Sequence, residues 1–518
     1  MTIFKKHISF FFSGAILVIA VWLLYPHFQY YVDPDSTAYL TLAKRYVEGD
    51  YDSAINGYWS PFSIWLVALG MKAGFNAMPS AVVVNALAAI GFLYLSHLFF
   101  RKLFLKKMSC WLLEIALSVF LTYAVYWQLF ADLWGCFFLL WVLYELLRET
   151  FIKNKANWLL VGLLGALAYL SKAYSLPFFV LEIIVFAWFF MRKNDKPTKA
   201  SLTFVFGVFG TLFLCALPWF LLLHQKYGIW TTGTAGMLNT SWYLVGHPYW
   251  KHNVGAILPP VYANSPSYWE DPFRANGATP HFWNSMKLFT LQIIRIGYNS
   301  LKFLQSISEL SIFFSVAIVV AFFHIRKNLS TLFFEPQHKF LSVSFLLFPL
   351  GYFLINFEAR YLWFMVPLGM VLLVKTIEMI ADRLKINMNG LVALLAFSFM
   401  AYPIVGLKKM YGIGLDDHEI ACKIKQAGIK GGLTSNIPYG VESQRLMRIS
   451  FFANMPFYTL PFAVPKSKLV DEMDRYGILY LISVQPGWPM EANSGFKKIP
   501  VDTASDIELW QRENKETR

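Results

Sequence analysis

The sequence predicts an α-helical protein that crosses a membrane many times. Of its 518 residues, 57% are hydrophobic and only 15% are charged, whereas an ordinary soluble domain has roughly 45–50% and 25%. Aromatic residues reach 18%, and apolar runs long enough to cross a hydrocarbon layer of about 30 Å recur along the chain. This composition excludes a soluble multidomain enzyme, a disordered chain and a disulfide-rich scaffold.

Eleven apolar runs are expected to be membrane spans. The first follows a basic start at Lys5 and Lys6 and has no small-residue cleavage site after it, so we interpret it as an uncleaved span. The shorter apolar segment 61–74 predicts a helix lying at the membrane interface. The predicted spans lie near residues 8–25, 79–100, 109–126, 133–150, 158–174, 175–191, 202–224, 309–324, 340–357, 362–380 and 390–407.

The distribution of Lys and Arg predicts the orientation. The short connections on the side of the N-terminus carry 19 of these residues, whereas those on the opposite side carry five. An excess of Lys and Arg marks cytoplasmic connections. We therefore expect an inner (cytoplasmic) membrane protein with a cytoplasmic N-terminus, and the same excess accounts for most of the net charge of +14 without a nucleic-acid partner.

Two units are expected. Residues 1–407 would form the transmembrane domain, with outer loops 26–78 and 225–308. The tail 408–518 alternates helical stretches, Asp417 to Gln426 and Lys466 to Tyr476, with strand-like runs. It therefore predicts a small α/β domain on the non-cytoplasmic (periplasmic or extracellular) side.

Four groups of ionisable residues fall at or near the outer side of the membrane, where such residues are costly and usually serve a site. They follow span one, lie in the turn after span three, lie near the outer end of span five, and form the short connection between spans nine and ten. They contain Asp33 and Asp35 with Tyr39 just after them, then Asp132, then Lys172, and finally Glu358, Arg360 and Tyr361. Their convergence on one face predicts a functional site.

Each group also has a purely structural interpretation. The first two acids would cap the helix that begins near Thr37, and the acid after span three would be a turn residue. The lysine would extend to the outer headgroups, and the last acid and arginine would form a structural ion pair. His247 and His252 with Glu270 and Asp271 are metal-ligand residue types, but their spacing does not support a metal site.

The chemistry that suits the four groups is transfer from a lipid-linked phosphate donor at the outer leaflet. Lys172 and Arg360 would bind the phosphate. One carboxylate would take the proton of the attacking hydroxyl. A second would orient the acceptor or, with the first, hold a divalent cation, so a metal requirement stays open.

These residues resemble those of the GT-C class of membrane glycosyltransferases, in particular protein O-mannosyltransferases and lipid A aminoarabinose transferases. The resemblance covers about residues 1–380, in motifs that are individually weak but occur in the family's order. The matching segments are Asp35-Ser-Thr-Ala-Tyr39, Gly57-Tyr-Trp-Ser-Pro61, Asp132 with the helix after it, Ala166-Leu-Ala-Tyr-Leu-Ser-Lys172-Ala173, Leu217-Pro-Trp219, Lys226-Tyr-Gly228, and Glu358-Ala-Arg360-Tyr361 with Pro367.

The resemblance implies a GT-C-like fold and places Asp35, Asp33 and Asp132 as catalytic candidates. It implies donor-phosphate binding by Lys172 and Arg360, supported by Tyr39, Glu358 and Tyr361. Ser36 stands where many members have a second acid, and this departure leaves open whether Asp33 or Asp35 is the base.

The function expected from these features is transfer of a sugar from a polyprenyl-phosphate donor to an acceptor lipid, glycan or protein on the outer face of the inner membrane, in contact with membrane lipids. A flippase or transporter of lipid-linked sugars is the alternative from another class. Transporters often contain paired repeats and midplane sites, which this sequence lacks. A surface-polysaccharide polymerase or ligase is the third alternative, and the sequence does not separate it from the first.

Overall fold

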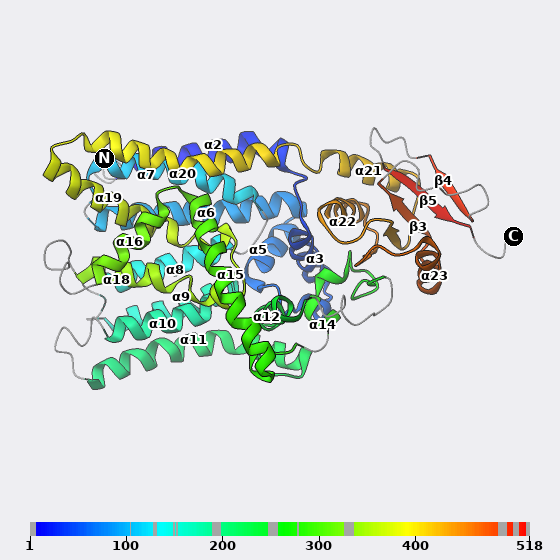
Figure 1. The fold of residues 1–518 in the computed structure, drawn as a ribbon, viewed down its shortest axis with the longest axis horizontal. Coiled ribbons are helices and arrows are strands. Elements are labelled where there is room, and N and C mark those ends of the chain that lie inside the picture. The colour runs from blue at the N-terminus through cyan, green and yellow to red at the C-terminus, as the bar shows by residue number, and fades with distance from the viewer. Residues whose placement is uncertain are drawn as a thin grey trace.

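The computed structural model describes residues 7–103, 105–127, 132–148, 151, 154–188, 198–246, 257–276, 279–325, 336–484, 495–500 and 507–513. Most of the chain is a bundle of long helices whose axes run along the longest dimension of the molecule, and a small sheet lies beyond one end of this bundle (Figure 1). The protein is thus mainly helical, as its composition predicts.

Each of the eleven predicted spans overlaps a helix, although several of these helices are shorter than the predicted span. Five described helices are long and apolar enough to cross a membrane, namely α2, α6, α7, the part of α11 from Leu202, and α20 continued into α21; a bent pair would make six. A multi-pass membrane protein follows from these helices, while eleven spans stays a prediction. The bundle helices are α2 (Ile8–Phe28), α6 (Ala77–Lys102), α7 (Lys107–Tyr126), α8 (Asp132–Leu146), α9 (Lys155–Ser171), α10 (Ser175–Phe186), α11 (Thr198–Tyr227), α16 (Phe314–Ile325), α18 (Pro336–Leu347), α19 (Met365–Leu384) and α20 (Met388–Met410).

The end of the bundle nearest the sheet carries several shorter helices (Figure 1). The expected interface helix is α5, which begins at Pro61 and packs against α3, α6 and α9. The others are α3 (Pro34–Glu48), α4 (Tyr51–Ala54), α12 (Ala235–Val245) and α14 (Pro272–Asn276), with α5 spanning Pro61–Lys72 and 3₁₀ turns η2 (Tyr268–Glu270), η3 (Phe282–Asn284), η4 (Leu350–Leu354) and η5 (Ala359–Leu362). Of these elements, α3, α12, η4 and η5 carry residues of the candidate site.

Helix α15 (Met286–Leu310) lies in the predicted outer loop 225–308 and was not predicted as a helix. It meets α16 at a bend of 112° and runs across the bundle helices in Figure 1. Over most of its length its buried side chains are polar: Gln292 and Asn299 donate hydrogen bonds of 3.0 and 2.8 Å to the carbonyls of Leu354 and Phe353. Many of its apolar side chains, such as Leu301, are exposed. This reversed pattern explains why hydropathy alone did not identify the helix.

The tail contains a five-stranded sheet of order β2-β1-β3-β5-β4, in which β1 pairs parallel with β2 and β3, and β5 pairs antiparallel with β3 and β4. The helical stretches predicted at 417–426 and 466–476 are both present. The elements are α21 (Leu415–Gln426), β1 (Leu433–Ser435), α22 (Val441–Ala453), β2 (Phe457–Tyr458), α23 (Lys466–Tyr476), β3 (Tyr480–Ser483), β4 (Phe496–Ile499) and β5 (Glu508–Arg512). A mixed sheet with helices is the α/β arrangement that the sequence pattern favours, and its independence as a domain stays a prediction.

The tail contacts the membrane part through α3 and the end of α2. The ring of His418 in α21 stacks on Tyr30 with the centroids 3.9 Å apart. Lys44 of α3 donates a 3.2 Å hydrogen bond to Asn454, just after α22. These contacts place the tail beside the helix that carries the first group of acids.

Candidate active site

The two acids that precede Tyr39 have different surroundings. Asp33 is the N-cap of α3, and its carboxylate accepts a 2.8 Å hydrogen bond from the backbone N–H of Ser36. Pro34 at the first helical position and Gly49 with φ 82° after the last fix the two ends of this helix. Asp35 lies in the first turn with its carboxylate free of a capping bond, so the structural interpretation applies to Asp33 rather than to Asp35.

Asp35 is held between an indole and a guanidinium. The N–H of Trp269 donates a 2.7 Å hydrogen bond to one carboxylate oxygen, and Arg360 lies 3.4 Å from the other. Burial, with a smaller contribution from the nearby Asp33, raises the pKa of Asp35 to about 7, although Arg360 and Trp269 oppose this shift. A carboxyl group with this pKa exchanges its proton near neutral pH, as a general base requires.

Arg360 is the cation shared by the acidic groups. Its Nε donates a 2.7 Å hydrogen bond to Glu358, and its terminal nitrogens lie 3.4 Å from Asp35 and 3.8 Å from Asp132. The hydroxyl of Tyr361 donates a 3.1 Å bond to Glu358. Burial favours neutral Glu358, but Arg360 and Tyr361 hold the pKa of this carboxyl below its usual value. The connection 358–361 therefore presents a guanidinium fixed by Glu358 and directed toward Asp35 and Asp132.

Lys172 and Asp132 form an ion pair between two bundle helices. Asp132 begins α8, and Lys172 is the C-cap of α9, so both lie at the same end of the bundle. The ammonium of Lys172 also lies 4.4 Å from the ring centre of Tyr361, within cation–π range. These contacts fix a second cation beside Arg360.

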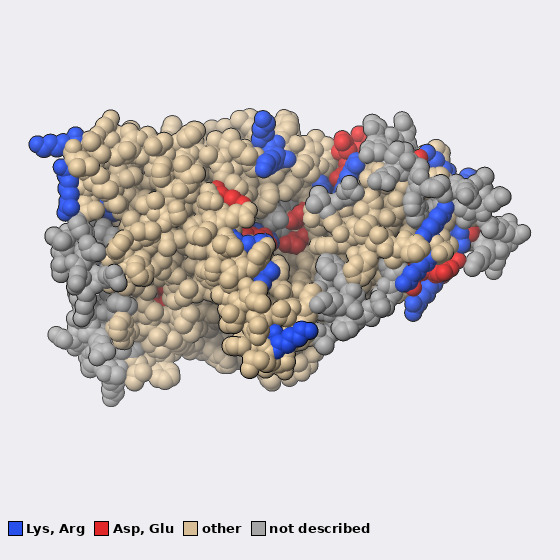
Figure 2. Space-filling model, in the orientation of Figure 1, with Lys and Arg blue, Asp and Glu red and all other residues tan. Residues whose placement is uncertain are grey.

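These side chains line one cavity of 310 Å³. A space-filling view shows a hollow between the bundle and the tail with acidic side chains inside it (Figure 2). One wall is aromatic, because Tyr352 stacks on Tyr174 at 3.7 Å and on Tyr361 at 4.9 Å between centroids. The predicted residues that line the cavity are Asp35, Tyr39, Asp132, Lys172, Arg360 and Tyr361.

The two remaining predicted residues are adjacent to the cavity. Asp33 caps the helix of Asp35, and Glu358 binds Arg360 from the side. All eight predicted residues are therefore near one another, although they come from four separate connections. Their roles stay predictions.

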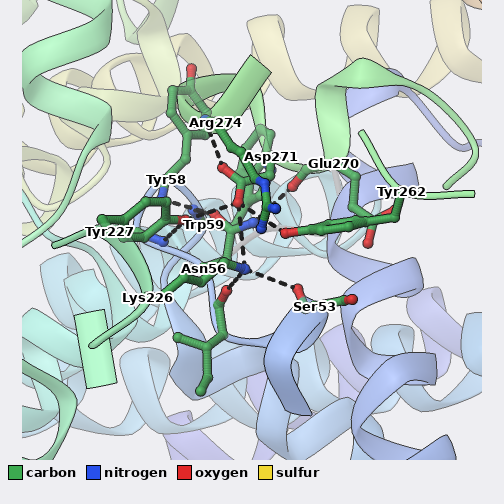
Figure 3. A network of polar contacts seen from close by, with 12 residues as sticks. Ser53, Asn56, Tyr58, Trp59, Lys226, Tyr227, Tyr262, Glu270, Asp271 and Arg274 are labelled. Carbon is green, nitrogen blue, oxygen red and sulfur yellow. Dashed lines mark hydrogen bonds and ion pairs between the residues drawn. The ribbon is translucent and has the colours of Figure 1, made fainter. Parts of the chain in front are cut away.

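Sequence reasoning missed a buried network next to the cavity, which is shown in Figure 3. Arg45 of α3 pairs with Glu270, and Lys226 at the end of α11 lies 3.5 Å from Asp271. The signal available in the sequence was the adjacent acid pair 270–271 in an aromatic-rich segment, together with Arg45 and Lys226. The acid pair was considered only as a set of metal ligands.

The carboxylates of this network are paired with Arg45 and Lys226 rather than grouped as metal ligands. His247 and His252 lie outside the described residues. Among the described residues, no group of three or more His, Cys, Asp or Glu side chains is placed to hold a metal ion. In the cavity, Asp35 and Asp132 each face a cation of the chain, so the residues present fit charge neutralisation by side chains.

Comparison with known proteins identifies the fold. No protein-family model and no curated protein matches the chain in sequence. The structure resembles ArnT from Cupriavidus metallidurans bound to undecaprenyl phosphate, with a TM-score of 0.56, 11% identity, and coverage of 96% of this chain and 97% of that one. The apo state of the same ArnT gives 0.57, 12% identity and the same coverage.

A second similar structure is the apo oligosaccharyltransferase of Archaeoglobus fulgidus, with a TM-score of 0.50, 11% identity, and coverage of 93% of this chain and 70% of that one. ArnT and this oligosaccharyltransferase are both GT-C glycosyltransferases. The GT-C fold that the sequence motifs predicted is therefore confirmed. At these identities the likeness concerns the fold, and it extends beyond residue 380 into the tail.

Proposed function

We propose that this protein is a membrane glycosyltransferase that moves a sugar from a polyprenyl-phosphate donor to an acceptor lipid, glycan or protein at the outer face of the cytoplasmic membrane. The observation that carries the proposal is the cavity in which Asp35 faces two cations, Arg360 and Lys172. The fold shared with ArnT, whose structure contains undecaprenyl phosphate, supports the same class of donor.

In the proposed reaction, the acceptor hydroxyl attacks the anomeric carbon of the donor sugar. A new carbon–oxygen bond to the acceptor forms while the bond from the anomeric carbon to the phosphate oxygen breaks. Asp35 takes the hydroxyl proton, and polyprenyl phosphate leaves with the additional negative charge. General-base assistance of this kind typically contributes about 10²- to 10⁴-fold.

Lys172 and Arg360 would stabilise the departing phosphate. Arg360, held by Glu358 through its Nε, would turn its planar guanidinium toward the phosphate, while Lys172 acts as a point charge. Asp132 contacts both cations, so we assign it the task of holding them apart and in place. If Asp132 and Asp35 instead hold a divalent ion, chelation would inactivate the wild-type protein.

The direct test is to incubate the purified full chain with a panel of polyprenyl-phosphate sugars and measure release of polyprenyl phosphate with transfer of the sugar. Release that depends on an added acceptor supports the proposal. Movement of the intact lipid-linked sugar across vesicle membranes without cleavage would instead establish the transporter alternative. Turnover only with pyrophosphate-linked donors would support a polymerase or ligase.

The two cations give a sharper test of the donor. Arg360→Ala and Lys172→Ala should each raise the donor KM, because a charge-assisted hydrogen bond contributes about 1.5–3 kcal/mol. Arg360→Lys should also be impaired, since an ammonium does not reproduce the planar guanidinium. Arg383→Ala, at the other end of the bundle in α19, is the matched control and should leave the donor KM unchanged. Wild-type KM in both site variants would return these cations to a structural role.

A further inference from the structure

We infer that Trp269 is a positioning residue for Asp35, and that a buried network of charges fixes the indole from behind. The inference rests on the proposed function, because it assigns Trp269 the role of orienting Asp35, the base of that reaction. Trp269 does not line the cavity. It acts on the reaction through the carboxylate that does.

The indole of Trp269 is aimed at the carboxylate and clamped by other rings. Its N–H donates the 2.7 Å hydrogen bond to Asp35. One face stacks on Trp242 of α12, with the centroids 5.2 Å apart and the planes at 17°. Trp59 meets it edge-on at 6.0 Å and 69°. Aromatic pairs in these arrangements are favourable beyond the area they bury, so the two contacts hold the indole in its orientation.

The backbone around Trp269 is tied to the connection 55–60. The indole of Trp59 donates a 3.2 Å hydrogen bond to the carbonyl of Trp269, and the amide of Asn56 donates a 2.8 Å bond to the carbonyl of Glu270. The hydroxyl oxygen of Ser267 accepts a 3.2 Å hydrogen bond from the backbone N–H of Trp269. The short turn η2 is therefore held through three backbone groups of two adjacent residues, Trp269 and Glu270.

The two residues after Trp269 are buried acids, and each has a cationic partner. Glu270 pairs with Arg45, which also lies 2.6 Å from Asp50. Asp271 lies 3.5 Å from Lys226 and accepts a 3.0 Å bond from the hydroxyl of Tyr227 and a 3.3 Å bond from that of Tyr262. Figure 3 shows Lys226, Tyr227 and Tyr262 around Asp271.

This arrangement fastens both partners of the Trp269–Asp35 bond to one helix. Asp35 lies near the start of α3, and Arg45, which holds the turn that carries Trp269, lies near its end. A movement of α3 therefore moves Asp35, which accepts the hydrogen bond, together with Arg45, which anchors the turn that carries Trp269. A purely structural tryptophan would not need its N–H directed at a carboxylate that lines a cavity.

Other groups also face Asp35, and their charges bear on its protonation. The ionisable groups are Asp33 on the same helix, Lys172 from the end of α9, and Glu358 and Arg360 from the connection before α19. Four phenols face it as well, and burial raises the pKa of each, so they stay neutral near pH 7: Tyr39, Tyr58, Tyr243 and Tyr439. The bond from the indole N–H of Trp269 is 2.7 Å long, whereas the bond from Arg360 to the other carboxylate oxygen is 3.4 Å long.

A hydrogen bond donated to a carboxylate favours the ionised form, so its loss raises the pKa. Trp269→Phe removes the N–H and keeps a ring for stacking. In infrared difference titrations of the purified full chain, with the Asp35 signal identified by its loss in Asp35→Asn, we expect the protonation midpoint of Asp35 to rise by about one pH unit in Trp269→Phe. Turnover at neutral pH should fall several-fold and recover at alkaline pH.

The matched control is Trp230→Phe. Trp230 is 68% exposed and stacks on His224, so its replacement should leave the midpoint unchanged. If Trp269→Phe does not fold, replacement of Trp269 by benzothienylalanine removes only the N–H. An unchanged midpoint in a folded variant, or a loss of turnover that is equal at every pH, would overturn the inference. The midpoint is read without substrate, so absence of glycosyl transfer in the wild type would count against the proposed function alone.

Discussion

Asp33 and Asp35 are two residues apart, and their contacts give them different tasks. The carboxylate of Asp33 satisfies an N–H at the start of α3, whereas that of Asp35 faces Arg360 and the cavity. Because a cap needs only an acceptor oxygen, Asn serves almost as well as Asp there. A base needs a group that can take a proton, so the amide distinguishes the two roles.

Asp35→Asn should lower kcat by about 10²- to 10⁴-fold without changing the fold. Asp33→Asn is the matched control and should change kcat much less. The measurement is steady-state turnover of properly inserted protein, with thermal unfolding to verify the fold. Turnover of Asp35→Asn within a few-fold of wild type would remove Asp35 from the mechanism and move the assignment to Asp33 or Asp132.

The pH dependence of the reaction should follow Asp35. Burial raises its pKa to about 7, so below this pH the carboxyl is protonated and cannot accept the hydroxyl proton. We therefore expect kcat/KM to rise with pH on the acidic side of the profile, with its midpoint at about 7, and then to level off. A profile that is flat between mildly acidic and neutral pH would show that no group with this pKa acts as the base.

At the scale of elements, α3 joins the site to the outer segments. Its first turn carries Asp35, its last turn carries Arg45, and its exposed Lys44 contacts the tail. Arg45 is almost fully buried and binds Glu270, Asp50 and Ser265. Removing one partner of a buried pair leaves an uncompensated charge, which typically costs about 3–5 kcal/mol.

Arg45→Met should therefore lower the thermal stability of the outer segments strongly, as measured by thermal unfolding of the purified protein in detergent. The double variant Arg45→Met/Glu270→Met should recover much of the loss, because neither buried position is then charged. Lys44→Met changes an exposed neighbour and should have little effect. Equal destabilisation by the single and double variants would show that the pair is not the source of the cost.

At the scale of the whole molecule, the helices place all four groups of site residues at the end of the bundle that faces the tail (Figure 1). The bias of 19 Lys and Arg against five predicts that this end is on the non-cytoplasmic side of the membrane. The tail and the cavity are then on the same side of the membrane, where a lipid-linked donor at the outer leaflet would be reached.

Cysteine labelling in intact cells tests this orientation. In a background with Ser in place of the native cysteines, Ser467→Cys in α23 should react with an impermeant thiol reagent. Asn389→Cys, at the start of α20, should react only after the cells are opened. Both positions are exposed in the structure, so accessibility to the reagent depends on the side of the membrane. The opposite labelling pattern would invert the topology and exclude an outer-leaflet donor.

The sequence by itself determined the class of the molecule and the position of its apolar helices, because hydropathy acts over a few helical turns and leaves a local record. It also singled out the four polar groups by their cost near a membrane. Hydropathy did not identify helix α15, because many of its apolar side chains are exposed while Gln292 and Asn299 bind carbonyls of another segment. The tertiary structure alone decided that Arg360 lies beside Asp35 across 325 positions, and that Trp269 reaches Asp35 across 234. Contacts between residues so far apart depend on how helices pack and on which buried charges find partners, and no local pattern in the chain records either.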